Sequence, residues 1–281
     1  MNNQSRKPRI IEITVKKALT RSGLPDIDYA LNPYLGCLHG CIYCYARNYT
    51  YIKEIRENWG RVVAVKTNLI DILRKEISMV KKGVVGVGTI TDPYQPVEAI
   101  YELTRRSLIL LLEKGFHTSI QTKNTLILRD IDIFEKYVDR IDIGFTITTM
   151  NNEIARLIEP YSSPPTMRAF ALEKISSRGI DTWIFYGPVI PKLNDDEETI
   201  KNILLLAKKT RSRVLVDNLH IKSFMYDSNH PLRKYVYMAR RYDWKKFYDK
   251  VLEMCSSENV KCIIGFYEPS DKHILLDEFV A

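Results

Sequence analysis

The chain has 281 residues, of which 45% are hydrophobic and 27% are charged, and its formal net charge is +8. This length suits one α/β domain or two small ones, and no apolar run approaches the ~20 residues that a membrane-spanning helix needs. The basic N-terminus is not followed by an apolar segment of the secretory type. We therefore expect a cytoplasmic, monomeric protein without a membrane span, whose charge suits nucleic acid, an acidic partner or solubility alone.

Short segments rich in Val, Ile and Thr alternate with amphipathic segments along the chain. Several of the apolar segments are nearly continuous, as in strands that are buried on both faces. The expected strands are 62–65, 84–90, 117–121, 141–147, 180–186, 214–221 and 261–266, and the expected helices are 69–80, 97–114, 166–178 and 195–209.

This alternation predicts a parallel sheet with helical crossovers. About six such units fall short of the eight of a closed TIM barrel, so we predict a partial (β/α)6 barrel over residues 28–221. Residues 1–27 are expected to form an N-terminal tail or extension, the first ten or so of them a short tail, and residues 222–281 a helical and strand extension packed on the barrel. Functional groups should gather at the C-terminal ends of the strands.

Five cysteines are present, and Cys37, Cys41 and Cys44 follow the spacing C-x3-C-x2-C with glycines between and before them. Clustered cysteines in a reducing compartment are more often metal ligands than disulfides. Two metal centres fit the spacing: zinc with His39 as a fourth ligand, or an iron–sulfur cluster with one open coordination site. Cys255 and Cys262 are expected to be small buried hydrophobic residues, with pairing to each other or a further metal ligand as the alternatives.

The spacing C-x3-C-x2-C, with Tyr43 just before the third cysteine, resembles the signature of the radical SAM superfamily. The resemblance implies a [4Fe–4S] cluster on the three cysteines, with S-adenosylmethionine chelating the fourth iron. Reduction by ferredoxin or flavodoxin would then cleave the cofactor to methionine and a 5′-deoxyadenosyl radical. Tyr43 would lie near the adenine, and His39 would be a loop residue rather than a ligand.

The segment Thr-Asp-Pro-Tyr-Gln-Pro-Val-Glu at 91–98 resembles, more narrowly, the branch of this family related to spore photoproduct lyase. The residues that the resemblance assigns to the cofactor lie at the ends of successive predicted strands. They are Thr91 and Asp92 for the amino group, Gln121 and Lys123 beside the carboxylate, Thr148 and Thr149 at the ribose, Glu159 and Arg168 of an E-P…R pattern, and Ile190, Pro191 and Asn194 near the adenine.

Several of these residues also have structural interpretations. Asp92 can cap the helix that follows it, and Asp195 is expected to cap the helix at 195–209. Glu159 and Arg168 can form a structural ion pair instead of meeting the cofactor.

Spore photoproduct lyase returns a hydrogen atom from a cysteine beside the strand end that carries the T-D-P-like motif. This chain has no cysteine between Cys44 and Cys255, which argues against thymine-dimer repair. Tyr94 is the candidate hydrogen donor in its place.

Residues 233–250 interleave basic and aromatic side chains. Such a segment can hold extruded bases, but an amphipathic helix that buries its aromatic residues on the barrel is favoured. Three functions therefore compete: a radical enzyme acting on nucleic acid, one acting on a small metabolite, lipid precursor or peptide, and a non-catalytic cluster or zinc protein.

Overall fold

The computed structural model describes residues 7–265, and its centre is an eight-stranded sheet in the order β11-β10-β9-β8-β7-β6-β3-β2. The strands from β3 to β11 pair in parallel, and β2 pairs antiparallel to β3 at the edge. The bounds are β2 Leu19–Arg21, β3 Tyr29–Leu31, β6 Val84–Val87, β7 His117–Thr122, β8 Ile141–Thr146, β9 Asp181–Val189, β10 Arg213–Asn218 and β11 Cys262–Ile264.

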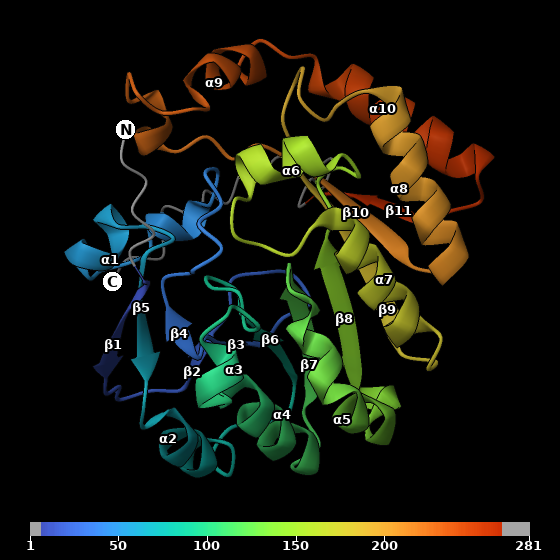
Figure 1. Cartoon of the computed structure of the whole chain (residues 1–281). Coiled ribbons are helices and arrows are strands. Elements are labelled where there is room, and N and C mark those ends of the chain that lie inside the picture. The colour runs from blue at the N-terminus through green and yellow to red at the C-terminus, as the bar shows by residue number, and fades with distance from the viewer. Residues whose placement is uncertain (1–6, 266–281) are drawn as a thin grey trace.

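Helices follow the parallel strands and cover the outer side of the curved sheet (Figure 1). Helix α8 shows why: Ile200, Ile203, Leu204 and Ala207 recur at helical spacing and are all buried in the core. The bounds are α2 Leu69–Glu76, α3 Glu98–Tyr101, α4 Leu103–Glu113, α5 Ile131–Lys136, α6 Asn152–Ile158, α7 Pro165–Ser176 and α8 Glu197–Thr210.

The predicted partial barrel is confirmed, because β3, β6, β7, β8, β9 and β10 are parallel and β2 and β11 remain as separate edges. Within residues 7–265, no helix is long and apolar enough to cross a bilayer.

Two predicted helix boundaries are wrong. The helix expected at 97–114 is divided into α3 and α4, since Glu102 between them has a left-handed φ of 49°. Helix α8 is capped by Asp196, whose side chain accepts from the Thr199 N–H, and not by Asp195. Asp195 instead accepts from the Lys192 N–H and the Tyr242 hydroxyl.

A second, three-stranded sheet corrects the prediction for the N-terminal region. Its order is β1-β5-β4, with bounds β1 Arg9–Ile13, β4 Tyr34–Leu35 and β5 Val62–Lys66. The segment 62–65, expected among the strands of the parallel sheet, lies instead in this small sheet, and the barrel opens with β3. Within the N-terminal region, residues 9–13 and 19–21 are strands, since each pairs with a neighbour.

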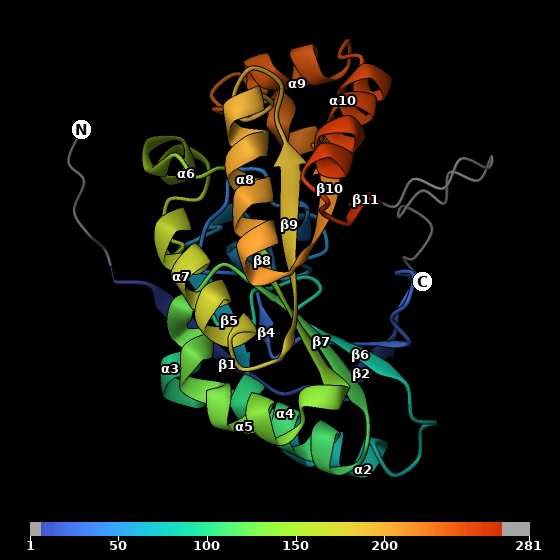
Figure 2. The ribbon, with the colours of Figure 1, turned by 90° about the vertical axis from the view of Figure 1, so that its right-hand side faces the viewer.

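The C-terminal region contributes α9 Arg233–Ala239, α10 Trp244–Ser257 and β11, which pairs with β10 (Figure 2). Its aromatic residues Tyr242, Trp244, Phe247 and Tyr248 pack against one another and against the core. The amphipathic interpretation of this segment is confirmed for these residues. The strand expected at 261–266 is β11, and Phe266 lies outside the described residues.

Cys255 and Cys262 form a disulfide that joins α10 to β11, so the expectation of two separate buried thiols is wrong. The physical reason is the turn between α10 and β11, which brings the two Cα atoms to 6.2 Å, within the usual range for a disulfide. Cys255 itself is buried, as predicted.

This pairing predicts the thiol count of the denatured apo-protein. Ellman titration without reductant should give three thiols, those of Cys37, Cys41 and Cys44, and titration after reduction and removal of the reductant should give five. Five thiols in protein that has never met a reductant would contradict the bridge.

Candidate functional site

The three cysteines lie in the loop between β4 and the short 3-10 helix at Tyr45–Arg47. Gly36 and Gly40 have positive φ angles of 85° and 62°, which glycine adopts at little cost. A Cβ atom on Gly36 would also lie 2.4 Å from the Ile55 side chain. Cys37 and Cys41 are buried, Cys44 is half-buried, and all three are free thiols.

The thiols suit a metal centre better than an acid–base role. Burial raises the pKa of the Cys41 thiol to about 12 although Lys123 opposes this, and burial together with Asp92 raises the pKa of Cys37 well above its usual range. A bound metal reverses this effect because it deprotonates a coordinating thiol. Three thiols in one loop, next to the cation of Lys123, therefore fit an iron–sulfur cluster that keeps one iron free of a protein ligand.

The zinc alternative fits the structure less well. His39 is buried, with its Nδ1 3.2 Å from Asp92 Oδ2 and its Nε2 3.2 Å from Asn124 Nδ2, so both ring nitrogens face other groups. Among residues 7–265, no three His, Cys, Asp or Glu side chains converge on the position of a single ion.

Gln95 fixes the loop of residues 36–44 that carries the three cysteines, named the cluster loop for the cluster that its cysteine spacing suggests. The sequence did not single out Gln95. Its Oε1 accepts from the Leu38 N–H at 2.8 Å, and its Nε2 donates to the Gly36 carbonyl at 3.2 Å. The Thr91 hydroxyl donates to the same carbonyl at 2.6 Å. The available signal was the motif at 91–98, in which Gln95 directly follows Tyr94, the candidate hydrogen donor.

Asp92 joins three segments of the site. Its Oδ1 accepts from the Tyr94 N–H at 2.9 Å and from the Thr122 hydroxyl at 2.7 Å, and its Oδ2 accepts from the Lys123 N–H at 2.8 Å. Burial alone would raise the pKa of this carboxyl, but His39, Lys123 and Thr122 together lower it to about 2. The expectation that Asp92 caps the following helix is wrong, because its side chain fixes the turn at Tyr94 and the end of β7, and the N-cap position of α3 is Val97.

A second set of contacts joins the loop to the segment after α6. The Tyr43 hydroxyl donates to Glu159, and Arg168 lies 2.5 Å from the same carboxylate, with all three side chains buried. Arg168 also donates to the Thr146 carbonyl at the end of β8. Glu159 and Arg168 therefore form the structural ion pair, while Lys123 Nζ lies 6.0 Å from the centre of the Tyr43 ring.

The end of β8 supplies buried hydroxyls. Thr148 Oγ1 is buried and has no hydrogen-bond partner among the described residues, so it is free for a ligand. The Thr149 hydroxyl accepts from the Asn151 N–H, and the Gln121 side chain donates to the Thr146 hydroxyl.

Asn194 joins the ends of β8 and β9. Its side chain donates to the Thr148 carbonyl and accepts from the Ile190 N–H. Ile190 packs in one apolar cluster with Cys41 and Tyr43, and Pro191 beside it is buried.

Tyr94 does not have the surroundings expected of a hydrogen donor. Its hydroxyl donates to Asp130 at 3.0 Å inside the core, and Asp130 is also bound by Arg105 and Arg129. Burial and the charge of Asp130 raise the pKa of Tyr94 well above its usual range. The structure gives Tyr94 a role in this ionic network and does not support the predicted donor role.

Comparison of the sequence with known proteins finds a matching family model and several relatives. Residues 31–204, more than half of the chain, match the family model described as the radical SAM superfamily. An uncharacterized protein of Methanocaldococcus jannaschii is 30% identical over 263 residues, covering 90% of this chain and 96% of that one. An uncharacterized protein of Mycobacterium tuberculosis is 29% identical over 232 residues, covering 77% and 68%.

Two solved structures share the fold. Spore photoproduct lyase complexed with a dinucleoside spore photoproduct has a TM-score of 0.67 at 12% identity, covering 92% of this chain and 82% of that one. Streptococcus suis SuiB bound to S-adenosylmethionine has a TM-score of 0.57 at 14% identity, covering 92% and 50%.

The contacts of Asp92 predict the effect of Asp92→Asn. The amide would turn an N–H₂ group toward buried donors, so the free energy of unfolding of the apo-protein should fall by about 3 kcal/mol. Urea unfolding measures this, and Asp71→Asn on the surface of α2 is the control, with a loss below about 0.5 kcal/mol. An equal loss of unfolding free energy in the two variants would contradict the structural role assigned to Asp92.

The low pKa of Asp92 also makes its contribution to the stability of the protein depend on pH. Its stabilising effect is complete above its unfolded pKa of 3.8 and is lost as the pH falls toward about 2. The difference in stability between the wild type and Asp92→Asn should therefore shrink in acid.

Proposed function

The chain belongs to the radical SAM superfamily, and we propose that it binds a [4Fe–4S] cluster through Cys37, Cys41 and Cys44 and cleaves S-adenosylmethionine reductively. The observation that carries the proposal is the set of three free thiols in one loop beside Lys123. Hydrogen bonds from Gln95 and Thr91 hold this loop. When bound, the cluster would supply one electron to S-adenosylmethionine, whose 5′ carbon–sulfur bond would break to give methionine and a 5′-deoxyadenosyl radical able to remove a hydrogen atom from the substrate.

The residues around the loop provide the binding groups in this proposal. The Lys123 ammonium suits the cofactor carboxylate, and the unpartnered Thr148 hydroxyl suits a ribose hydroxyl. Tyr43, Ile158 and Ile190 form an apolar wall beside Cys41, which suits the adenine and excludes water. Glu159 and Arg168 act indirectly in this proposal, because their ion pair orients Tyr43.

We extend the proposal to nucleic acid as the substrate class to test first. Its support is the net charge of +8 and the fold shared with a lyase whose structure holds a dinucleoside spore photoproduct. The aromatic residues of α10 do not support it, since they pack inside. The chemistry would differ from that lyase, because no cysteine lies between Cys44 and Cys255 to return a hydrogen atom.

The central part of the proposal predicts cofactor cleavage. Protein reconstituted anaerobically with iron and sulfide, and reduced with dithionite, should convert S-adenosylmethionine to 5′-deoxyadenosine, detected by chromatography. Cys41→Ala should abolish the product because a ligand is lost, whereas the double variant Cys255→Ala/Cys262→Ala should retain it. Product from Cys41→Ala, or none from the wild type, would show the proposal to be wrong.

The substrate class predicts salt-dependent binding. A fluorescent oligonucleotide should bind the reconstituted protein with a log Kd that rises linearly with log salt, since each neutralised phosphate releases a counterion. Fluorescence anisotropy measures this. Absent binding, or binding that does not change with salt, would exclude nucleic acid.

A further inference from the structure

The segment around α9 is basic and has no acidic side chain of its own. Residues 228–242, which include α9, contain no Asp or Glu, and their four Lys and Arg side chains are all exposed: Arg233, Lys234, Arg240 and Arg241. The acidic residues at the two ends of this stretch, Asp227 and Asp243, each accept a hydrogen bond from a backbone N–H. The positive charge of the stretch is therefore not balanced within it.

Helix α9 turns one side inward and leaves the other open. Buried residues recur at helical spacing on the inner side, and they are Leu232, Val236 and Ala239. Successive residues of a helix are turned by about 100°, so an exposed set projects from the outer side, namely Arg233, Lys234 and Tyr237. Arg241 is exposed in the turn that directly follows α9. Arg233 and Tyr237, four residues apart, are neighbours on the helix surface.

The cations on the outer side have no acidic partner among the described residues. Within residues 7–265, the side chains of Arg233 and Arg241 form no ion pair and no hydrogen bond. Lys234 Nζ lies 4.7 Å from the centre of the Tyr235 ring, a contact that leaves its charge unneutralised. An anionic partner would therefore meet these cations without breaking an ion pair of the protein.

The ring of Tyr237 lies open among these cations. The residue is 49% exposed, and its ring makes a T-shaped contact with Tyr226 at a centroid distance of 6.0 Å. The Tyr226 hydroxyl lies 3.5 Å from a guanidinium nitrogen of Arg240. These contacts restrict the ring while about half of Tyr237 remains accessible. The aromatic residues of the following segment differ, because they pack against one another.

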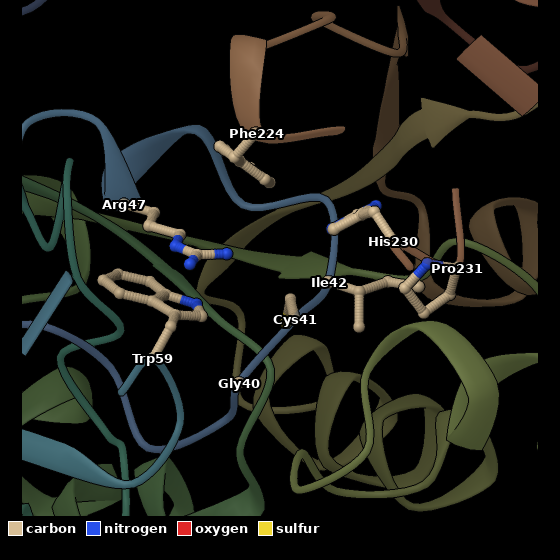
Figure 3. A pocket seen from close by; sticks show the side chains of 8 residues that line it. All are labelled: Gly40, Cys41, Ile42, Arg47, Trp59, Phe224, His230 and Pro231. Atoms are coloured by element: carbon tan, nitrogen blue, oxygen red, sulfur yellow. The ribbon is translucent and has the colours of Figure 1, made fainter. Parts of the chain in front are cut away.

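The inner side of α9 packs beside the cluster loop. Val236 belongs to the same apolar cluster as Cys41 and Tyr43. Figure 3 shows His230 and Pro231, which lead into α9, lining a pocket together with Cys41. Figure 2 shows α9 beyond the end of the sheet at which β9 ends. A molecule on the outer side of α9 would thus lie one helix diameter, about 10 Å, from the cluster loop.

We propose that the outer side of α9 binds a single strand of nucleic acid, with phosphates on Arg233 and Arg241 and a base stacked on Tyr237. The inference rests on the proposed function, because it names the surface that holds the proposed substrate class. Basic side chains that follow the backbone, together with an aromatic ring on which a base stacks, are the features of single-strand binding. The exposed ring favours nucleic acid over an acidic protein, since every base has a face that stacks on it.

The test separates phosphate contacts from base stacking. Reconstituted wild type and variants are titrated with a fluorescent oligothymidylate at several salt concentrations, and anisotropy gives the Kd. In Arg233→Gln/Arg241→Gln, the Kd should rise about tenfold, and the slope of log Kd against log salt should fall by about 1.4, since each single-strand phosphate contact contributes about 0.7. In Tyr237→Ala, the Kd should also rise about tenfold, but the slope should keep its wild-type value because no phosphate contact is lost.

The matched control is Arg106→Gln/Lys114→Gln, which removes the same charge from exposed positions on α4 and directly after it. Helix α4 lies at the opposite end of the molecule from α9 (Figure 1), so the control should leave the Kd and the slope unchanged. Thermal melting of every variant at the wild-type temperature verifies that the fold is intact.

The outcomes distinguish this surface from the proposed function. Wild-type Kd and slope in both α9 variants would overturn the surface alone and leave the substrate class standing. An equal fall of the slope in the control would mean that overall charge, and not this face, attracts the strand. Weaker binding in the arginine variant with a wild-type Kd in Tyr237→Ala would refute the stacking mode. A wild type that binds no oligonucleotide would refute both the substrate class and the surface.

Discussion

The side chain of Gln95 holds the cluster loop in the conformation on which the whole site depends. Three thiols can converge only if the backbone between them turns tightly, and such a turn leaves N–H and C=O groups without partners in a regular element. Gln95 and Thr91 satisfy the Leu38 N–H and the Gly36 carbonyl. Because both side chains come from the segment after β6, the loop is fixed to the barrel and not only to the small sheet that carries it.

Buried charges connect the same segments. Asp92 joins the segment after β6 to the end of β7, and the ion pair of Glu159 and Arg168 joins the cluster loop, through Tyr43, to the end of β8. Pairs of this kind contribute little net stability when whole, but removal of one partner leaves an uncompensated charge and is costly. Their effect here is to fix the positions of side chains around the thiols, which is what a reactive site requires.

Much of the fold could be predicted from the sequence, and the predictions that were wrong have physical reasons. The strands at 117–121 and 141–147 were found because their apolar pattern and length are distinctive, and the cysteine spacing located the cluster loop. The segment 62–65 has the same apolar pattern, but pattern alone does not say which sheet a strand joins. The left-handed residue Glu102, the cap at Asp196 and the disulfide of Cys255 with Cys262 depend on tertiary packing, which no local signal carries.

The site residues, too, include some that the sequence located and some whose role depends on packing. Cys37, Cys41 and Cys44 are free thiols in one loop, and Thr148 has a buried hydroxyl that finds no hydrogen-bond partner within residues 7–265. Tyr94 was chosen for its place in a motif, but its ring turns into the core to meet Asp130. Gln95 stands one residue further along the same motif and contacts the loop. The direction of a side chain in an irregular segment follows from packing, so sequence position alone could not separate these two residues.

The most direct test of the account is the Mössbauer spectrum of protein reconstituted with ⁵⁷Fe, recorded with and without S-adenosylmethionine. Three cysteine ligands and a fourth iron open to the cofactor predict a [4Fe–4S] spectrum in which one iron changes its isomer shift when the cofactor binds. A spectrum that the cofactor leaves unchanged, or a protein that takes up zinc in preference to iron, would contradict the assignment of the three-cysteine loop.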